Sequence, residues 1–112
     1  MNKLIQERKI GGYMELRIQA IHFDASEKLQ DFIQKKCGKL EKYCDDIKNV
    51  EVLLKVVKPE SAMNKDVNIK VSVPNSEFFA EKVSDTFEES VDVCIDALSK
   101  QLTKHKEKLR GA

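Results

Sequence analysis

The sequence lacks the features that mark membrane and secreted proteins. Its 112 residues contain no apolar run that approaches the ~20 residues a membrane span needs. It has no apolar signal-peptide segment either, because Leu4-Ile5 is followed at once by Gln6, Glu7, Arg8 and Lys9. The length suits one domain with a single modest core. We therefore expect a single-domain cytoplasmic protein that does not contact the membrane.

Cysteine and catalytic motifs are also scarce. The three cysteines are odd in number, form no CxxC pair and fall in helical patterns, which favours buried thiols that pack as small apolar residues. The two histidines are not spaced with the cysteines as zinc ligands are. The sequence shows no Ser/His/Asp set, paired-carboxylate motif, glycine-rich phosphate loop or HExxH. We therefore expect no enzymatic activity, no metal, no cofactor and no small-molecule substrate.

Charge is nearly balanced overall but unevenly placed along the chain. The net charge is only +1, yet residues 100–110 carry five Lys or Arg against one Glu, whereas residues 77–96 carry seven carboxylates and one Lys. Acids at the start of a helix and bases at its end complement the helix dipole by ~0.3–1 kcal/mol each, but only within the terminal turns. The basic end is longer than that, so it favours a site that meets a polyanion at one place.

Hydrophobic periodicity predicts an α+β fold with the order β-α-β-β-β-α. The expected strands are residues 15–21, 47–57, 67–73 and 77–83, and the expected helices are 26–43 and 86–110. Ser26 and Thr86 suit the N-caps of these helices. We expect both helices to pack on one face of a four-stranded mixed sheet, with the first two strands parallel if adjacent and the other pairs antiparallel. Residues 14–112 would form this domain. Residues 1–13, cut off by Gly11-Gly12, would form a disordered leader, with Met14 as an alternative start.

Charges on the first helix are separated across its width. At about 100° per residue, Lys28, Lys35, Lys39 and Lys42 share one flank of the apolar stripe, and Glu27, Asp31 and Glu41 share the other. A merely solvated helix would interleave the signs in i,i+4 pairs, so the lysine flank favours a binding role. On the second helix, His105 aligns with Leu98 and Leu102. It could be a packing residue at the edge of the core or face a partner with the lysines.

Four segments carry a resemblance to a known family. They are LEKYCDDI at 40–47, VLLKV at 52–56, EFFAE at 77–81 and QLTKHKEKL at 101–109. In this order and spacing the chain resembles the short-form ribosome hibernation-promoting factors, also called ribosome-associated inhibitor or sigma-54 modulation protein. The resemblance runs from about Met14 to Arg110, and its most specific part is the last segment.

The resemblance implies a function as well as the fold. Such proteins bind the small ribosomal subunit across the mRNA channel and the tRNA sites, exclude mRNA and tRNA, and keep idle ribosomes inactive in stationary phase. The implied partner is ribosomal RNA, with no role for DNA. The implied contacts are Lys28, Lys35, Lys36, Lys39, Lys42, Lys55, Lys58, Lys100, Lys104, His105, Lys106, Lys108 and Arg110.

Other functions remain open from the residues alone. A double-stranded RNA-binding domain also packs helices on one sheet face, but it lacks a leading strand and its last helix begins with the basic cluster. In this chain that helix begins with acidic residues. A general structured-RNA-binding domain and a protein-interaction module that docks an acidic partner are the other candidates.

Overall fold

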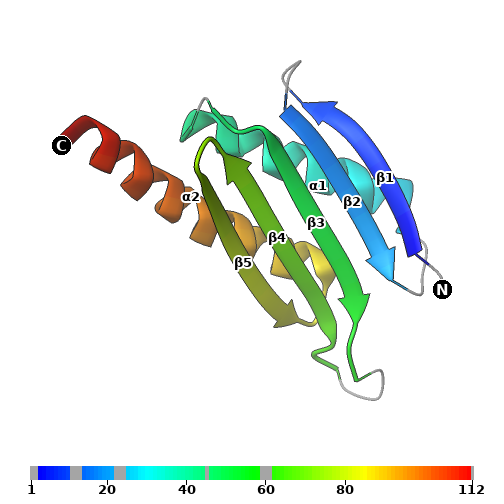
Figure 1. Cartoon of the computed structure of the whole chain (residues 1–112). Coiled ribbons are helices and arrows are strands. Elements are labelled where there is room, and N and C mark those ends of the chain that lie inside the picture. Colours follow the sequence, from blue (N-terminus) through cyan, green and yellow to red (C-terminus); the bar gives the residue numbers. More distant parts are fainter. Residues whose placement is uncertain (1–2, 11–13, 22–24, 45, 59–61, 112) are drawn as a thin grey trace.

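The structure, a computed structural model, describes residues 3–10, 14–21, 25–44, 46–58 and 62–111, with side chains described between Met14 and Lys108. Its elements follow one another along the chain (Figure 1). They are β1 (Lys3–Ile10), β2 (Met14–Ile21), α1 (Glu27–Gly38), the short 3₁₀ helix η1 (Lys39–Lys42), β3 (Asn49–Val56), β4 (Lys65–Val73), β5 (Ser76–Ser84) and α2 (Phe87–Gly111).

The strands form one mixed sheet in the spatial order β1-β2-β3-β4-β5, and both helices cover the same face of it (Figure 1). Strands β2 and β3 pair in parallel, with Leu16 opposite Val50. The β3–β4 and β4–β5 pairs are antiparallel. From Met14 onward this is the predicted α+β arrangement, β-α-β-β-β-α with a four-stranded mixed sheet, which is confirmed.

The amino-terminal segment differs from the prediction of a disordered leader. Lys3–Ile10 forms β1 and pairs antiparallel with β2 along its whole length, from Lys3 opposite Ile21 to Ile10 opposite Met14. The reason is that β2 would otherwise be an edge strand with unpaired backbone groups, which a neighbouring segment can satisfy. Gly11-Gly12, read as a break, is equally the sequence signal of a hairpin connection. Residues 11–13 themselves lie outside the described residues.

Local sequence signals set the ends of the helices and the last turn. The Ser26 hydroxyl accepts a hydrogen bond from the backbone N–H of Leu29 at 3.0 Å, and the Thr86 hydroxyl accepts one from Glu89 at 3.1 Å, so both predicted N-caps are confirmed. Asn75 has a φ of 68°, which suits a tight turn between β4 and β5. The first helix was expected to reach about Tyr43, but its regular part ends at Gly38 and the chain then tightens into η1.

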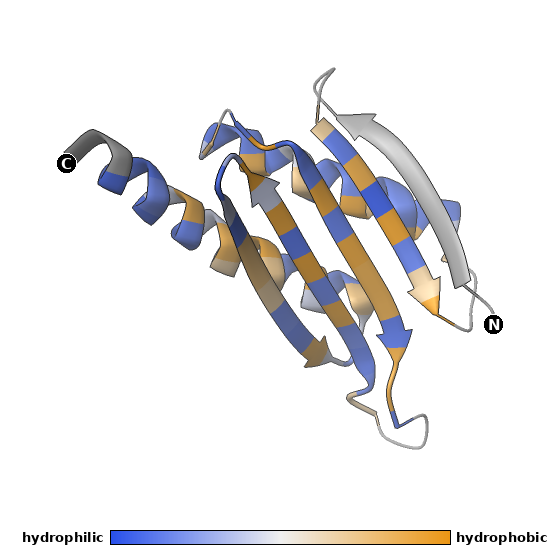
Figure 2. Ribbon diagram, viewed as in Figure 1, coloured by the Kyte–Doolittle hydropathy of each residue, from blue (hydrophilic) through white to orange (hydrophobic). Residues whose placement is uncertain are grey.

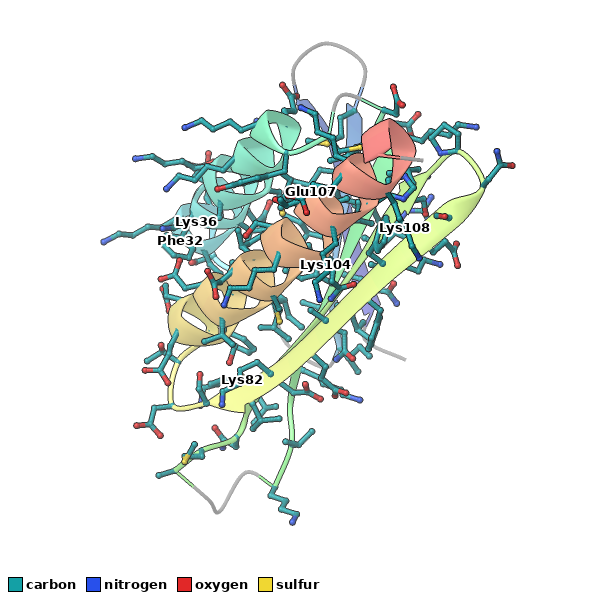
Figure 3. All side chains as sticks on the ribbon, turned by 90° about the vertical axis from the view of Figure 1, so that its left-hand side faces the viewer. Phe32, Lys36, Lys82, Lys104, Glu107 and Lys108 are labelled. Atoms are coloured by element: carbon teal, nitrogen blue, oxygen red, sulfur yellow. The ribbon has the colours of Figure 1, made fainter. Side chains whose placement is uncertain are left out.

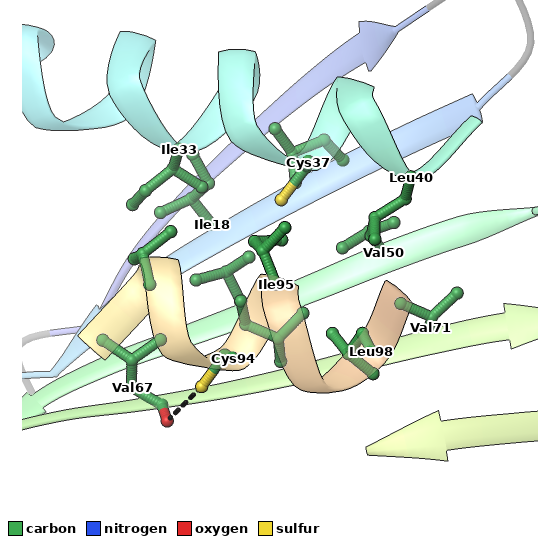
Figure 4. Close-up of a cluster of buried hydrophobic side chains, with 14 of the residues drawn as sticks. Ile18, Ile33, Cys37, Leu40, Val50, Val67, Val71, Cys94, Ile95 and Leu98 are labelled. Carbon is green, nitrogen blue, oxygen red and sulfur yellow. Dashed lines mark hydrogen bonds between the residues drawn. The ribbon is translucent and has the colours of Figure 1, made fainter. Parts of the chain in front are cut away.

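The core lies between the sheet and the two helices (Figure 4). Buried residues alternate with less buried ones along β2 and β3. The banded colours of the strands in Figure 2 show the matching alternation of hydrophobic and hydrophilic residues. Ile33 and Leu40 pack from the first helical segment, and Leu98 and Leu102 pack from α2, all fully buried. One of the described helices, α2, is long, but neither it nor any other described helix is apolar enough to cross a membrane.

The three cysteines are free and buried, as predicted. Burial raises the pKa of the Cys37 and Cys94 thiols to about 12. The Cys94 thiol also donates a weak hydrogen bond to the backbone oxygen of Val67, with an S–O distance of 3.6 Å (Figure 4). These thiols are therefore packing groups in the native protein, because the reactive thiolate is strongly disfavoured.

Candidate nucleic-acid interface

The topology brings the basic ends of both helices to the same end of the sheet. Helix α1 starts beyond β2, whose last residue Ile21 lies opposite Lys55 near the end of β3. Helix α2 starts beyond β5, whose last residue Ser84 lies opposite Lys65 at the start of β4. Both helices then run back along the sheet, so η1 and the carboxyl-terminal half of α2 meet near the start of β3 (Figure 1). Contacts between η1 and α2 confirm this placement.

Hydrogen bonds fix the opposite, acidic end of α2 to the sheet. The hydroxyls of Ser84 and Ser90 lie 2.6 Å apart, and the Ser90 hydroxyl donates to the backbone oxygen of Lys65 at 2.8 Å. Both serines are fully buried, so these bonds satisfy groups that would otherwise be costly to bury. The start of α2 therefore has a defined position against β4 and β5.

One lysine of α1, Lys36, faces α2. Lys36 forms a 3.0 Å ion pair with Asp92 of α2 and lies over the ring of Phe32, with 5.4 Å from its Nζ atom to the ring centroid (Figure 3). At about 100° per residue, the other lysines of α1 and η1 lie about 60–120° around the helix from Lys36, on the exposed outer face. We call the exposed members the α1 lysine row; they are Lys28, Lys35, Lys39 and Lys42.

Neighbouring lysines repel one another at this part of the helical face. The charge of Lys36 lowers the pKa of Lys39 from its usual value, with smaller effects from desolvation and from the charges of Lys35 and Lys42. Cations crowded in this way raise the local positive potential. A polyanion placed there would relieve the repulsion, so the row suits a phosphate-rich partner.

The basic residues of α2 divide between its two flanks. Lys106 lies about four turns beyond Asp92, at ~3.6 residues per turn, and therefore shares the flank that faces α1. Lys104 and Lys108 share the flank of Gln101, whose side chain donates a hydrogen bond to the backbone oxygen of Phe79 at 3.2 Å, so they face β5 (Figure 3). Lys100 pairs with Asp96 at 3.2 Å on the exposed side. The basic end thus borders both α1 and β5.

Not every predicted contact joins this surface. Lys55 forms a 3.6 Å ion pair with the buried Asp66, and Lys58 follows the end of β3, so both lie at the opposite end of the sheet from η1. Lys28 lies at the start of α1, about two turns before Lys35. Lys36 belongs to the surface but is partly neutralised by Asp92. The side chain of Arg110 lies outside the described part of the chain.

Sequence reasoning missed a groove between α2 and the start of β5. His105, half-buried, contacts the ring of Phe78 edge-on, with ring centroids 5.2 Å apart and an interplanar angle of 66°. The groove beside them is lined by Ser76, Phe78, Gln101, Lys104, His105, Glu107 and Lys108. His105 therefore both packs at the edge of the core and borders an open surface, so the two readings of this residue are compatible. The alternation of β5 could have placed Phe78 on the helical face, but not beside His105.

Among the described residues, no group of three or more His, Cys, Asp or Glu side chains is arranged to hold a metal ion. This surface presents cations, aromatic rings, and amide and hydroxyl groups. Such a surface can bind phosphate and base groups through charge, stacking and hydrogen bonds.

The fold and this surface define a small α+β domain with a basic helical face. The chain belongs to the family described as Sigma 54 modulation protein / S30EA ribosomal protein, whose model matches residues 16–110. The resemblance predicted from the four sequence segments is thereby confirmed.

Individual relatives agree with this assignment. The chain is 31% identical over 103 residues to the ribosome hibernation promoting factor of Pseudomonas putida. The matched region covers 88% of this chain and 97% of that protein. It is 34% identical over 97 residues to the factor of the same name from Escherichia coli, covering 87% and 98%. Among solved structures, a ribosomal subunit interface protein from Coxiella burnetii matches with a TM-score of 0.68 and 27% identity, covering 84% and 97%. The amino-terminal domain of Thermus thermophilus Protein Y shares the fold, with a TM-score of 0.68 and 20% identity over 83% and 96%.

Proposed function

We propose that this protein binds the small ribosomal subunit through ribosomal RNA and holds idle ribosomes inactive. The observation that carries the proposal is the gathering of lysines from α1, η1 and α2 at one end of a chain whose net charge is only +1. A localised cluster of this kind favours one defined polyanionic site over non-specific coating. The names of the relatives, ribosome hibernation promoting factors, support the same partner.

The proposed mechanism is steric occlusion. A folded body of about 49 × 26 × 22 Å, held in the mRNA channel by lysine–phosphate contacts, would collide with mRNA and with tRNA in the neighbouring sites. Inhibition would then need no chemical step and no cofactor, and it would be reversible, since each phosphate contact is a salt-sensitive exchange of counterions. The site of action is the cytoplasm, where ribosomes work, and neither DNA nor a small-molecule substrate takes part.

Charge reversal tests whether the α1 lysine row carries the binding. The triple variant K35E/K39E/K42E should keep its fold, because these side chains are exposed and lie off the buried stripe. It should also lose nearly all pelleting with isolated small subunits. The control K65E/K82E reverses charge on β4 and β5 and should pellet like the original protein. Undiminished pelleting of the triple variant, with cooperative thermal unfolding intact, would defeat the proposal.

Competition tests the occlusion itself. In an initiation assay with about one copy of the protein per ribosome, raising the concentrations of initiator tRNA and mRNA should relieve the inhibition, because all three would compete for the same space. Inhibition that stays constant as both ligands reach saturation would rule out occlusion. Such a result would indicate that the protein binds the small subunit at a place outside the mRNA channel and the tRNA sites.

A protein-interaction module remains the competing candidate, and the nature of the partner separates the two. Small subunits treated with ribonuclease should lose the protein if RNA is the partner. Retention of the protein on ribosomal proteins that survive the treatment would favour protein docking instead.

A further inference from the structure

We propose that the groove between α2 and the start of β5 holds one unpaired nucleotide of single-stranded RNA, with its base against the Phe78–His105 pair and its phosphates on Lys104 and Lys108. This inference rests on the proposed function and adds a base-contacting subsite to the lysine–phosphate contacts of that proposal. Its occupant is identified by chemistry, because the groove combines the two components that nucleotide-binding surfaces use, aromatic rings and cations.

The rings are placed to accept a base. In an edge-to-face pair, the ring that presents its edge keeps both of its faces clear of its partner. Both side chains are partly buried, both line the groove, and Phe78 also packs against the core, which holds the pair in place. A base stacked there would meet a preformed platform.

The backbone around the groove is also fixed. Gln101 of α2 donates its side-chain hydrogen bond to the backbone oxygen of Phe79, at 3.2 Å, and so ties the lysine-bearing flank of the helix to β5. The hydrogen bond orders the inner part of the wall, at Gln101, and groups that are already ordered lose little conformational entropy on binding, which favours affinity.

The charges of the groove favour a nucleotide over an apolar ligand or a peptide side chain. Lys104 and Lys108 lie one helical turn apart on one wall, at a rise of about 6 Å, which is comparable to the spacing of neighbouring phosphates in an extended strand. Glu107 also lines the groove, so the net positive charge is small. Charge alone would therefore give weak binding there, and the rings would supply the additional, base-dependent part.

The test compares a base-bearing strand with a bare backbone of equal charge. Using the full chain, we would measure the affinity for a fluorescein-labelled oligoadenylate decamer and for the matching abasic decamer. The original protein should prefer the oligoadenylate by about tenfold, the usual loss when an aromatic stacking partner is removed. Phe78→Leu, which keeps an apolar side chain for the core, should abolish the preference without changing the affinity for the abasic strand.

Two further variants make the result specific. The matched control Phe79→Leu removes a ring that is 55% exposed on the opposite face of the sheet, and it should keep the preference. The double change K104Q/K108Q should weaken the binding of both strands equally. In ¹H NMR spectra, oligoadenylate should shift the ring protons of His105 more than those of His22, the other histidine in the chain.

Several outcomes would overturn the assignment. The first is that the original protein binds the two strands with equal affinity. The second is that Phe79→Leu loses the preference for oligoadenylate as fully as Phe78→Leu does. The third is that a polyglutamate decapeptide displaces labelled oligoadenylate as efficiently as unlabelled RNA does. Pelleting with small subunits separates this inference from the proposed function. If the protein pellets with small subunits but shows no base preference, only the nucleotide subsite is refuted. If the original protein does not pellet, both the subsite and the proposed function are refuted.

Discussion

The α1 lysine row should govern how steeply ribosome binding falls with salt. Nine of the lysines implied as contacts are exposed in the described structure. Two are left out of the count, because Lys58 lies at the far end of the sheet and Lys100 is paired with Asp96. The remaining seven are Lys28, Lys35, Lys39, Lys42, Lys104, Lys106 and Lys108. Neutralising three of them in K35Q/K39Q/K42Q leaves four. These substitutions remove charge without adding repulsion, so the change in salt dependence reports the phosphate contacts that were lost.

The size of the effect follows from counterion release. With a log–log slope of about −0.7 to −0.9 per phosphate contact, seven contacts give a slope of about −5 to −6 and four give about −3 to −4. Between 50 and 200 mM monovalent salt, the original protein should therefore lose affinity by about a thousandfold or more, and the variant by only about 50- to 150-fold. At low salt the variant should be the weaker binder, and the two affinities should converge as salt rises.

The assay is fluorescence anisotropy of labelled protein titrated with isolated small subunits, at constant Mg²⁺ and several KCl concentrations. The matched control K65Q/K70Q/K82Q removes the same charge from β4 and β5. There Lys70 pairs with Glu51 and Glu77, at 3.4 and 3.7 Å. The control should keep the original slope. A triple variant of the α1 lysine row that binds more weakly but with the original slope would show that these lysines act without touching phosphate.

Three further results are expected. K36A should weaken small-subunit binding less than K39A in the same titration, because Lys36 is already paired with Asp92 while Lys39 is exposed; an equal or larger loss would contradict this. Deleting residues 1–10 should lower the melting temperature measured by circular dichroism by several degrees, at about 4–8 °C per kcal/mol, because β2 loses its edge partner; an unchanged value would mean that β1 contributes nothing. Stability to urea should fall as pH rises from about 9 toward 12, because unfolded Cys37 and Cys94 release protons near pH 9.0 while the folded thiols keep theirs up to about 12. C37A/C94A should show a shallower decline, and an identical one would refute the assignment.

The parts of the fold that could be predicted from sequence are those set by local rules. Alternation along β4 and the caps at Ser26 and Thr86 depend on residues close in sequence, and the structure agrees with them. Strand β1 could not be predicted in this way, because its stability depends on pairing with an edge of β2 that its own pattern does not reveal. The local rule for Gly11-Gly12 also had two readings, a break and a hairpin.

The site shows the same division. The separation of lysines on α1 follows from helical geometry alone, so sequence could propose it. The neutralisation of Lys36 by Asp92 joins residues on two different helices, and the Phe78–His105 contact joins β5 to α2. Only tertiary packing brings such pairs together. For the same reason, sequence could not show that Lys55 and Lys58 lie at the far end of the sheet.

The basic end of α2 extends beyond the part of the helix that is packed on the sheet. At its fixed end, the hydrogen bonds of Ser84 and Ser90 secure the helix to the sheet, and Leu102 is the last fully buried residue of its described side chains. From Thr103 to Lys108 the side chains are exposed apart from half-buried His105, so this stretch relies on helix propensity while its lysines repel one another. A bound polyanion would cancel that repulsion. Ligand binding and stiffening of the free end are therefore coupled, and hydrogen exchange beyond Leu102 should slow when the ribosome is bound.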